Sequence, residues 1–299
     1  MAEVGDDPNE ISLEEARKID PRYEVDDIVE TEVTPRNFGR IAAQNAKQVV
    51  VQRIREAERG MVFEKFSSRE NDIVTGIIQR MENKNVYIDL GKAEAILTPN
   101  EQIPGEIYQY HDRMKTYIVE VKKTSKGPQI MVSRTHPGLL KRLFELEVPE
   151  IHDGLVEIKS VAREPGMRSK ISVYTKDENI DPVGACVGHK GMRVQTIVNE
   201  LRGEKIDIVK YSSEPDQYVA NALSPAKVVS TEVLEEEKIC RVIVPDYQLS
   251  LAIGKEGQNA RLAAKLTGWK IDIKSESQAA EEAEQGAQEV GVAYEADKD

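Results

Sequence analysis

The sequence lacks the features of a membrane, secreted or metal-binding protein. It has no run of eighteen apolar residues that could span a bilayer. Its first twenty residues are acidic and polar, unlike a signal peptide, so we expect a cytoplasmic protein without membrane contact. Its two cysteines, Cys186 and Cys240, lie in apolar runs and are expected in the core of a protein from a reducing compartment. The four histidines share no metal-ligand spacing, so we expect no metal and no cofactor.

Motifs of common enzyme classes are also missing. Gly91-Lys92 and Gly254-Lys255 are not followed by the Ser or Thr that a Walker A phosphate loop requires. The sequence contains neither a Gly-x-Ser-x-Gly nucleophile elbow nor a His-Glu-x-x-His helix. We therefore expect a binding protein that is not an enzyme, and an enzyme with an unrecognised site remains the alternative.

The chain has fewer basic than acidic residues overall, but the excess acidic residues lie at its two ends. The net charge is −12, of which residues 1–32 carry −9 and residues 275–299 carry −7. The segment between them, 33–274, is therefore mildly basic at +4. The low isoelectric point describes the ends of the chain and does not exclude an anionic partner for its body.

Two glycine-bracketed loops form an internal repeat 66 residues apart. The first bracket is Gly188-His189-Lys190-Gly191 and the second bracket is Gly254-Lys255-Glu256-Gly257. Each follows an apolar residue, opens an amphipathic stretch and is followed by the same Lys-Ile-Asp-Ile phrase, at 205–208 and 270–273. A Gly-x-x-Gly loop that enters a helix lets a phosphate approach free backbone N–H groups. The repeated unit resembles the KH module, whose GxxG loop clamps single-stranded RNA.

The candidate RNA contacts are the bracket residues and polar side chains just after them. His189 and Lys190 give the first bracket a basic edge, whereas Glu256 opposes phosphate and leaves Lys255 as the cation of the second bracket. The full set is Gly188, His189, Lys190, Gly191 and Arg193 in the first unit, and Gly254, Lys255, Glu256, Gly257, Gln258, Asn259 and Arg261 in the second. The alternative is that each bracket is only a tight corner between two helices.

Residues 70–135 change to short, β-branched runs typical of strands. Turn signals separate five such runs, at 73–78, 85–90, 93–97, 117–122 and 129–133. Five short strands predict a small barrel such as the OB fold, and Asp72-Ile73-Val74-Thr75-Gly76 resembles its S1 version. Such barrels bind single strands through aromatic and basic side chains, which makes Tyr87, Lys122 and Lys123 candidates. Alternatively, Tyr87 is half-buried and the lysines are ordinary solvated residues.

The N-terminal part is expected to be mainly helical. Ser12-Leu13-Glu14-Glu15 is a capping box that predicts a short helix to about residue 19. Residues 28–33 read as a strand, and 37–66 as a long connecting helix with one apolar stripe that packs against a partner. Residues after 275 lack apolar periodicity and are expected to be disordered.

Three longer motifs carry a more specific resemblance. They are residues 180–188 (IDPVGACVG), 222–226 (ALSPA) and 253–263 (IGKEGQNARLA). With an S1-like barrel ahead of two KH-like units, they resemble the NusA family of bacterial transcription termination and antitermination factors. The resemblance implies binding of nascent single-stranded RNA and of RNA polymerase, further antitermination factors as partners, a monomeric state, and modulation of pausing, termination and antitermination.

The expected fold is α+β and multidomain. We expect a partial α/β N-terminal domain with its connecting helix at 1–66, an S1 (OB-fold) barrel at 67–137, bacterial-type KH domains at 138–211 and 212–275, and an acidic tail at 276–299. The alternative function is an accessory S1/KH RNA-binding subunit of an RNA-degrading complex. The order S1–KH–KH and the absence of a phosphorolytic domain argue against it.

Overall fold

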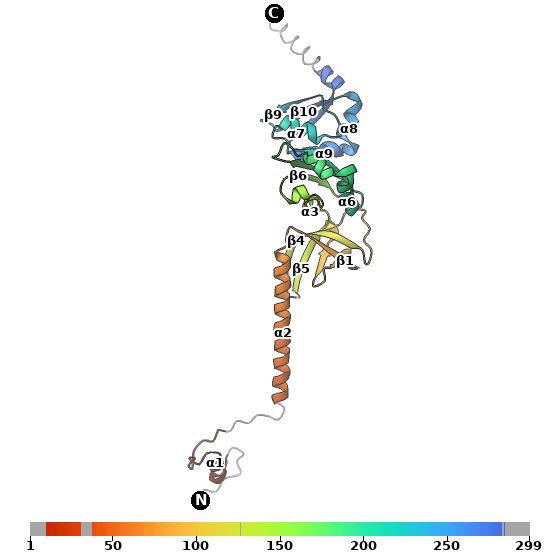
Figure 1. Cartoon of the computed structure of the whole chain (residues 1–299). Coiled ribbons are helices and arrows are strands. Elements are labelled where there is room, and N and C mark those ends of the chain that lie inside the picture. Colours follow the sequence, from red (N-terminus) through yellow and green to blue (C-terminus); the bar gives the residue numbers. More distant parts are fainter. Residues whose placement is uncertain (1–9, 31–37, 126, 283, 285–299) are drawn as a thin grey trace, which may run out of the picture. The chain divides into compact units, whose positions relative to one another are not determined.

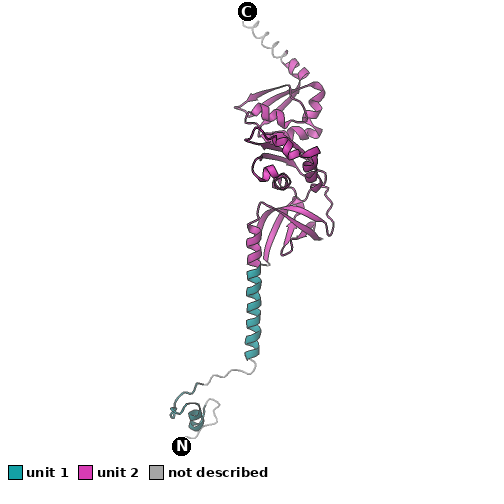
Figure 2. Cartoon of the chain, in the orientation of Figure 1, with its two compact units in different colours: residues 1–58 teal, residues 59–299 magenta. Residues whose placement is uncertain are grey.

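The fold is seen in a computed structural model that describes residues 10–30, 38–125, 127–282 and 284 (Figure 1). The chain divides into two compact units, residues 1–58 and 59–299 (Figure 2). No helix among the described residues is both long and apolar enough to cross a bilayer.

The first unit confirms the predicted short helix but not the predicted strand. Helix α1 (Leu13–Ile19) begins where the Ser12 hydroxyl accepts a hydrogen bond from the Glu15 N–H. Residues 28–30 form no strand, and residues 31–33 lie outside the described part of the chain. A strand needs a neighbour to pair its backbone groups, and the described part of this unit contains no second strand.

Helix α2 (Phe38–Ser67) confirms the predicted long helix. The expected burial of its apolar stripe is found only near its C-terminal end. Phe66 is buried in the barrel core, and Val62 and Phe63 pack against that core, whereas Ile41 and Ile54 are exposed.

Five strands close into the predicted small barrel in the order β1-β2-β3-β5-β4. They are β1 (Ile73–Glu82), β2 (Asn85–Asp89), β3 (Glu94–Leu97), β4 (Arg113–Thr124) and β5 (Gly127–Ser133), with a 3-10 turn η1 (Pro99–Glu101) after β3. Among the described residues of the barrel, β3 and β5 pair in parallel and the other neighbours pair antiparallel. Alternating residues fill the interior, among them Ile78, Ile88 and Ile118. Gly76 is required because a Cβ there would lie 2.4 Å from the Ile88 side chain.

The predicted KH order of elements is confirmed twice. The first domain, KH1, contains α3 (Pro137–Glu147), α4 (Pro149–His152), β6 (Glu157–Glu164), β7 (Arg168–Tyr174), α5 (Pro182–Val187), η2 (His189–Gly191), α6 (Met192–Glu200) and β8 (Lys205–Lys210). The second, KH2, contains α7 (Pro215–Ala222), β9 (Ser230–Leu234), β10 (Ile239–Val244), η3 (Asp246–Gln248), α8 (Leu249–Ile253), η4 (Lys255–Gly257), α9 (Gln258–Thr267) and β11 (Lys270–Ser275). Each has a three-stranded sheet, β6-β7-β8 or β11-β10-β9, in which the last strand runs parallel to the middle one.

The hydrophobic core of KH2 extends onto the KH1 sheet. Helices α7 and α9 of KH2 pack on the KH1 sheet, with α9 beside β6 (Figure 1). Ala162 and Val209 of that sheet join the core cluster of KH2. The Lys170 ammonium donates to the Ser224 carbonyl at 2.7 Å, and the Tyr218 hydroxyl donates to Ser172 Oγ at 2.8 Å. KH1 and KH2 therefore form a continuous packed body.

The start of the acidic tail differs from the prediction of disorder. Residues 276–282 are helical. Ser277 Oγ donates to the Asp246 carboxylate at 2.9 Å, and Lys274 pairs with Glu282. These contacts, one of them with a residue 31 positions away in the sequence, stabilise a helix that the composition does not indicate. Residues 285–299 of the predicted tail lie outside the described residues.

Candidate nucleic-acid interface

The two brackets adopt the same backbone conformation. Gly188 and Gly254 have φ of 74° and 77° with ψ of 176° and 173°. The third residue of each bracket, Lys190 or Glu256, is left-handed at φ 50° and 53°. Each bracket then closes on a left-handed glycine that precedes the next helix, α6 or α9. The sequence repeat is therefore a structural repeat.

The two glycines of a bracket are required for different reasons. A Cβ on Gly188 would lie 2.7 Å from Arg193 Cγ, and one on Gly254 would lie 2.8 Å from the backbone N of Asn259. The first glycine thus lets the loop pack on the following helix, as the helix-corner alternative requires. Around Gly257 no atom lies within 4 Å of such a Cβ, so only its positive φ favours glycine there.

Arg193 and Asn259 occupy equivalent positions, five residues after the first glycine. The Arg193 guanidinium donates to the Ala185 carbonyl at 2.6 Å and to the Glu150 carboxylate at 2.9 Å. The Asn259 amide donates to the carbonyls of Ala252 at 2.9 Å and Leu223 at 3.0 Å. Asn259, a candidate RNA contact in the sequence, is only 4% exposed, so its side chain is buried. Both residues hold the helix before the bracket in place.

Replacing Asn259 by alanine is expected to lower the free energy of unfolding by about 1–3 kcal/mol, because two buried carbonyls lose their donor. Urea unfolding would measure the loss. Gln195→Ala is the control, since Gln195 is exposed and, as far as the structure describes the chain, its side chain bonds just Asn199 of its own helix. Its effect should stay within about 0.5 kcal/mol. Unchanged stability of Asn259→Ala together with weaker RNA binding would contradict the structural role.

Three basic side chains of the brackets are exposed and have no partner among the described residues. His189, Lys190 and Lys255 lie on the surface. Within the described residues, none of their side chains has a hydrogen bond or ion pair. Glu256 is also exposed, and its backbone carbonyl accepts from the Arg261 guanidinium at 3.1 Å. The first bracket therefore presents two basic side chains and the second presents one beside a carboxylate.

Gln258 and Arg261 are held by a residue that the sequence analysis did not identify. Arg261 Nε donates to Glu164 Oε1 at 2.6 Å, and Gln258 Nε2 donates to Glu164 Oε2 at 2.8 Å. Glu164 ends β6 of KH1. No motif marks it, because its partners lie more than 90 residues away in the sequence.

The barrel candidates are all engaged by neighbouring side chains. Tyr87 is half-buried, as the alternative interpretation expected, and the Arg80 guanidinium lies 3.7 Å from its ring centroid. Lys122 pairs with Glu120 at 2.8 Å, and Lys123 lies over the Phe63 ring at 4.5 Å. A strand of RNA on this face would have to share or displace these contacts.

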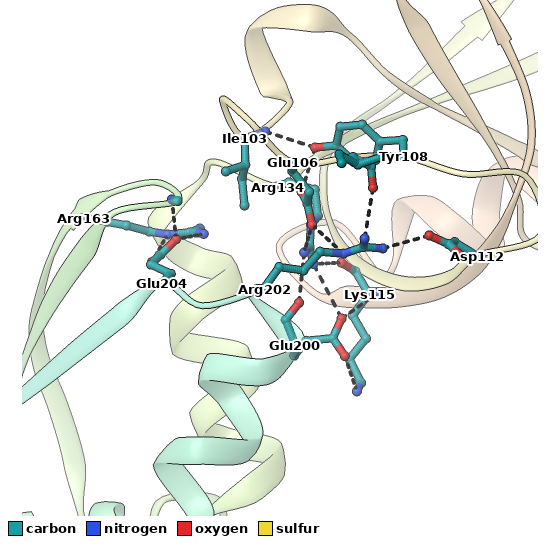
Figure 3. A network of polar contacts seen from close by, with 12 residues as sticks. Ile103, Glu106, Tyr108, Asp112, Lys115, Arg134, Arg163, Glu200, Arg202 and Glu204 are labelled. Carbon is teal, nitrogen blue, oxygen red and sulfur yellow. Dashed lines mark hydrogen bonds and ion pairs between the residues drawn. The ribbon is translucent and has the colours of Figure 1, made fainter.

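A buried charge network joins the barrel to KH1 (Figure 3). Arg134 is 1% exposed and pairs with Glu106, which is 2% exposed. Arg134 also donates to the carbonyls of Lys115 at 2.8 Å and Glu200 at 3.0 Å. Arg202 adds a pair with Asp112 at 2.9 Å. Charged groups buried this deeply hold the barrel and KH1 in one geometry as long as each keeps its partner.

A second buried pair lies within KH1 (Figure 3). The Arg163 guanidinium donates to both Glu204 oxygens, at 2.8 and 2.9 Å. Ser169 Oγ donates to the same carboxylate at 2.6 Å, as does the Gly166 N–H at 2.8 Å. Burial raises the pKa of Glu204, but these donors and the Arg163 charge outweigh it, so the pKa lies below the ordinary value. Among the described residues, no group of three or more His, Cys, Asp or Glu side chains could hold a metal ion.

Comparison with known families divides the chain in the predicted order. Residues 1–60 match the NusA N-terminal domain and 67–133 match the S1 RNA binding domain. Residues 134–211 match the NusA-like first KH domain, and 215–281 match the NusA-like second KH domain. Together these matches span nearly the whole chain.

Several curated proteins are similar over most of their length. A transcription termination/antitermination protein NusA from Halalkalibacterium halodurans is 71% identical over 281 residues, which are 94% of this chain and 74% of the relative. The Bacillus subtilis protein of the same name is 70% identical, over 93% of this chain and 75% of the relative. The NusA protein of Thermus thermophilus is 46% identical, over 91% of this chain and 70% of the relative. With this identity, these domains and two matching brackets, the chain belongs to the NusA family.

Proposed function

We propose that this chain is an RNA-binding transcription elongation factor that contacts nascent single-stranded RNA and RNA polymerase and so modulates pausing, termination and antitermination. Its family is that of transcription termination/antitermination proteins, and it carries S1 and KH domains. The observation that carries the proposal is the pair of brackets with the same backbone conformation and with exposed basic side chains at their tips. A factor that acts on nascent RNA works in the cytoplasm, and no step of this function requires turnover of a substrate.

In this proposal the backbones of Gly188, Gly191, Gly254 and Gly257 let RNA phosphates approach, and His189, Lys190 and Lys255 supply positive charge. Four further residues do not contact RNA but hold the brackets and neighbouring helices in place: Arg193, Asn259, Gln258 and Arg261. Tyr87, Lys122 and Lys123 extend the surface onto the barrel. We retain the domain limits 1–66, 67–137, 138–211, 212–275 and 276–299 as part of the proposal.

In this proposal the N-terminal domain makes the contact with RNA polymerase, because residues 1–60 match the NusA N-terminal domain. Its helix α2 is exposed along residues 39–58, which leaves surface for a protein partner. The proposed factor acts as a monomer, with other antitermination factors as further partners. A subunit of an RNA-degrading complex is not favoured, because the similar curated proteins are named for termination and antitermination.

Single-round transcription with a bacterial RNA polymerase, on a template with one pause and one intrinsic terminator, tests the proposal. Addition of the wild-type chain should change pause lifetime or readthrough by at least about twofold. The variant with His189→Asp and Lys190→Asp should have less than half of that effect, because its first bracket repels phosphate. Identical transcription with and without the chain would contradict the proposal, and co-purification with the polymerase would show separately which contact fails.

A further inference from the structure

The carboxylate of Glu164 joins KH1 to the first turn of helix α9 in KH2. Both of its oxygens are used, one by Arg261 at 2.6 Å and the other by Gln258 at 2.8 Å. The Glu164 side chain is 16% exposed. The hydrogen bond from Arg261 lowers the pKa of Glu164 against the opposing effect of burial, and Gln258 adds to that lowering. The carboxylate is therefore ionised and doubly bonded at neutral pH.

Arg261 continues the connection into the second bracket. Its Nη1 donates to the carbonyl of Glu256, the left-handed third residue of that bracket, at 3.1 Å. A chain of contacts thus runs from the Glu164 carboxylate through the Arg261 guanidinium to the bracket backbone. The equivalent residue of the first unit is Gln195, whose amide bonds Asn199 of the same helix at 2.9 Å. Only the second bracket has this connection to the neighbouring domain, among the contacts of the described residues.

The packing of the two KH domains does not depend on this connection. The KH2 core, which includes Ala162 and Val209 of KH1, is apolar. Further hydrogen bonds also cross the interface, from Lys170 to Ser224, from Tyr218 to Ser172 and from Asn221 to the Lys210 carbonyl. Loss of the Glu164 carboxylate would leave the domains together. It would release the Arg261 side chain and the bracket carbonyl that it holds.

We propose that Glu164 is a positioning residue of the RNA site, which fixes the second bracket relative to the first so that one RNA strand engages both. The inference rests on the proposed function. A KH module takes about four nucleotides, so the ligand that needs this alignment is a single strand long enough to cross both modules. Binding at the second bracket is then intramolecular, and its strength depends on how well the two sites are aligned.

A purely electrostatic role and a positioning role of Glu164 predict opposite effects of its neutralisation on RNA affinity. Glu164 is a negative charge close to a site for a polyanion. If charge alone matters, or if Glu164 keeps Arg261 away from phosphate, its neutralisation strengthens RNA binding of every length. If Glu164 positions the bracket, neutralisation weakens binding of RNA that spans both modules and leaves binding of a short RNA nearly unchanged.

The experiment compares Glu164→Gln, Arg261→Gln and the double variant with wild type, using fluorescence anisotropy with labelled A-rich RNAs of six and twelve nucleotides. The control is Glu157→Gln, on the same strand β6, which removes a carboxylate whose ion pair in the described part of the chain is with Lys159. Urea unfolding of each variant verifies that the body remains folded.

We expect Glu164→Gln to bind the twelve-nucleotide RNA about tenfold more weakly and the six-nucleotide RNA within about twofold of wild type. Arg261→Gln and the double variant should show the same loss, because all three break one connection. The control should bind both RNAs like wild type. Unchanged or tighter binding by Glu164→Gln, or equal weakening with both RNAs, would overturn the positioning role. A wild-type chain that bound neither RNA would overturn the proposed function and this inference with it.

Discussion

Replacing Glu204 by glutamine is expected to lower the free energy of unfolding of the residue 59–299 unit by about 3–5 kcal/mol. Arg163 and Glu204 are 1% and 0% exposed, and their two hydrogen bonds are 2.8 and 2.9 Å long. A glutamine would turn N–H groups toward the guanidinium and leave its charge buried without a counter-ion. Chemical denaturation followed by far-ultraviolet circular dichroism would measure the loss.

Glu232→Gln is the matched control for this change. Glu232 pairs with Arg241 at 3.4 Å, and both side chains are more than half exposed. Surface pairs of this kind contribute about 0–1 kcal/mol, so the control should unfold close to wild type. If the two variants lost equal stability, the buried pair would contribute no more than a surface one.

The contribution of the Arg163–Glu204 pair to stability should depend on pH. Because the folded-state pKa of Glu204 lies below its ordinary value of 4.5, its contribution to stability is complete above that value and disappears as the pH falls through the folded pKa. The difference in stability between wild type and Glu204→Gln should therefore be largest near neutral pH and shrink below about pH 4. A difference that did not change with pH would contradict an ionised, hydrogen-bonded Glu204.

The variant with His189→Asp and Lys190→Asp is expected to bind single-stranded RNA about 100-fold more weakly at low salt. The change lowers the charge of the first bracket by three units, because it removes the positive charge of Lys190 and adds two carboxylates. Each unit is worth about 1 kcal/mol against a phosphate about 4 Å away in water. The loss should shrink as salt is added, because exposed charges are screened. Anisotropy of a labelled twelve-nucleotide RNA over a salt series would measure both effects.

The backbone of the first bracket accepts this change without strain, because aspartate is tolerated in the left-handed conformation that Lys190 adopts at φ 50°. Lys238→Asp supplies the matched control. Lys238 is an exposed lysine at φ 52° in the turn between β9 and β10, and its replacement should weaken binding by less than about threefold. Equal RNA binding by the bracket variant and wild type would mean that the brackets are only helix corners.

Features that depend on neighbouring residues could be predicted from the sequence. The Ser12 cap of α1, the alternating strands of the barrel and the left-handed glycines of both brackets each involve residues a few positions apart. The strand expected at residues 28–33 is absent from the described part of that range, 28–30. A strand also needs a partner, and the described part of this unit contains none. The helix at 276–282 depends on Asp246, which lies 31 residues away from Ser277.

The sequence by itself determined that this chain has two equivalent glycine-bracketed loops after a small barrel, because glycine spacing and apolar periodicity are local properties. Only the tertiary structure decided which polar residues near those loops are free. Asn259 is buried, Arg261 is held by Glu164, and Lys190 is exposed, although all three were equal candidates in the sequence. The physical reason is that a side chain's partner depends on which sheet packs against its helix, and that packing brings together residues more than 90 positions apart.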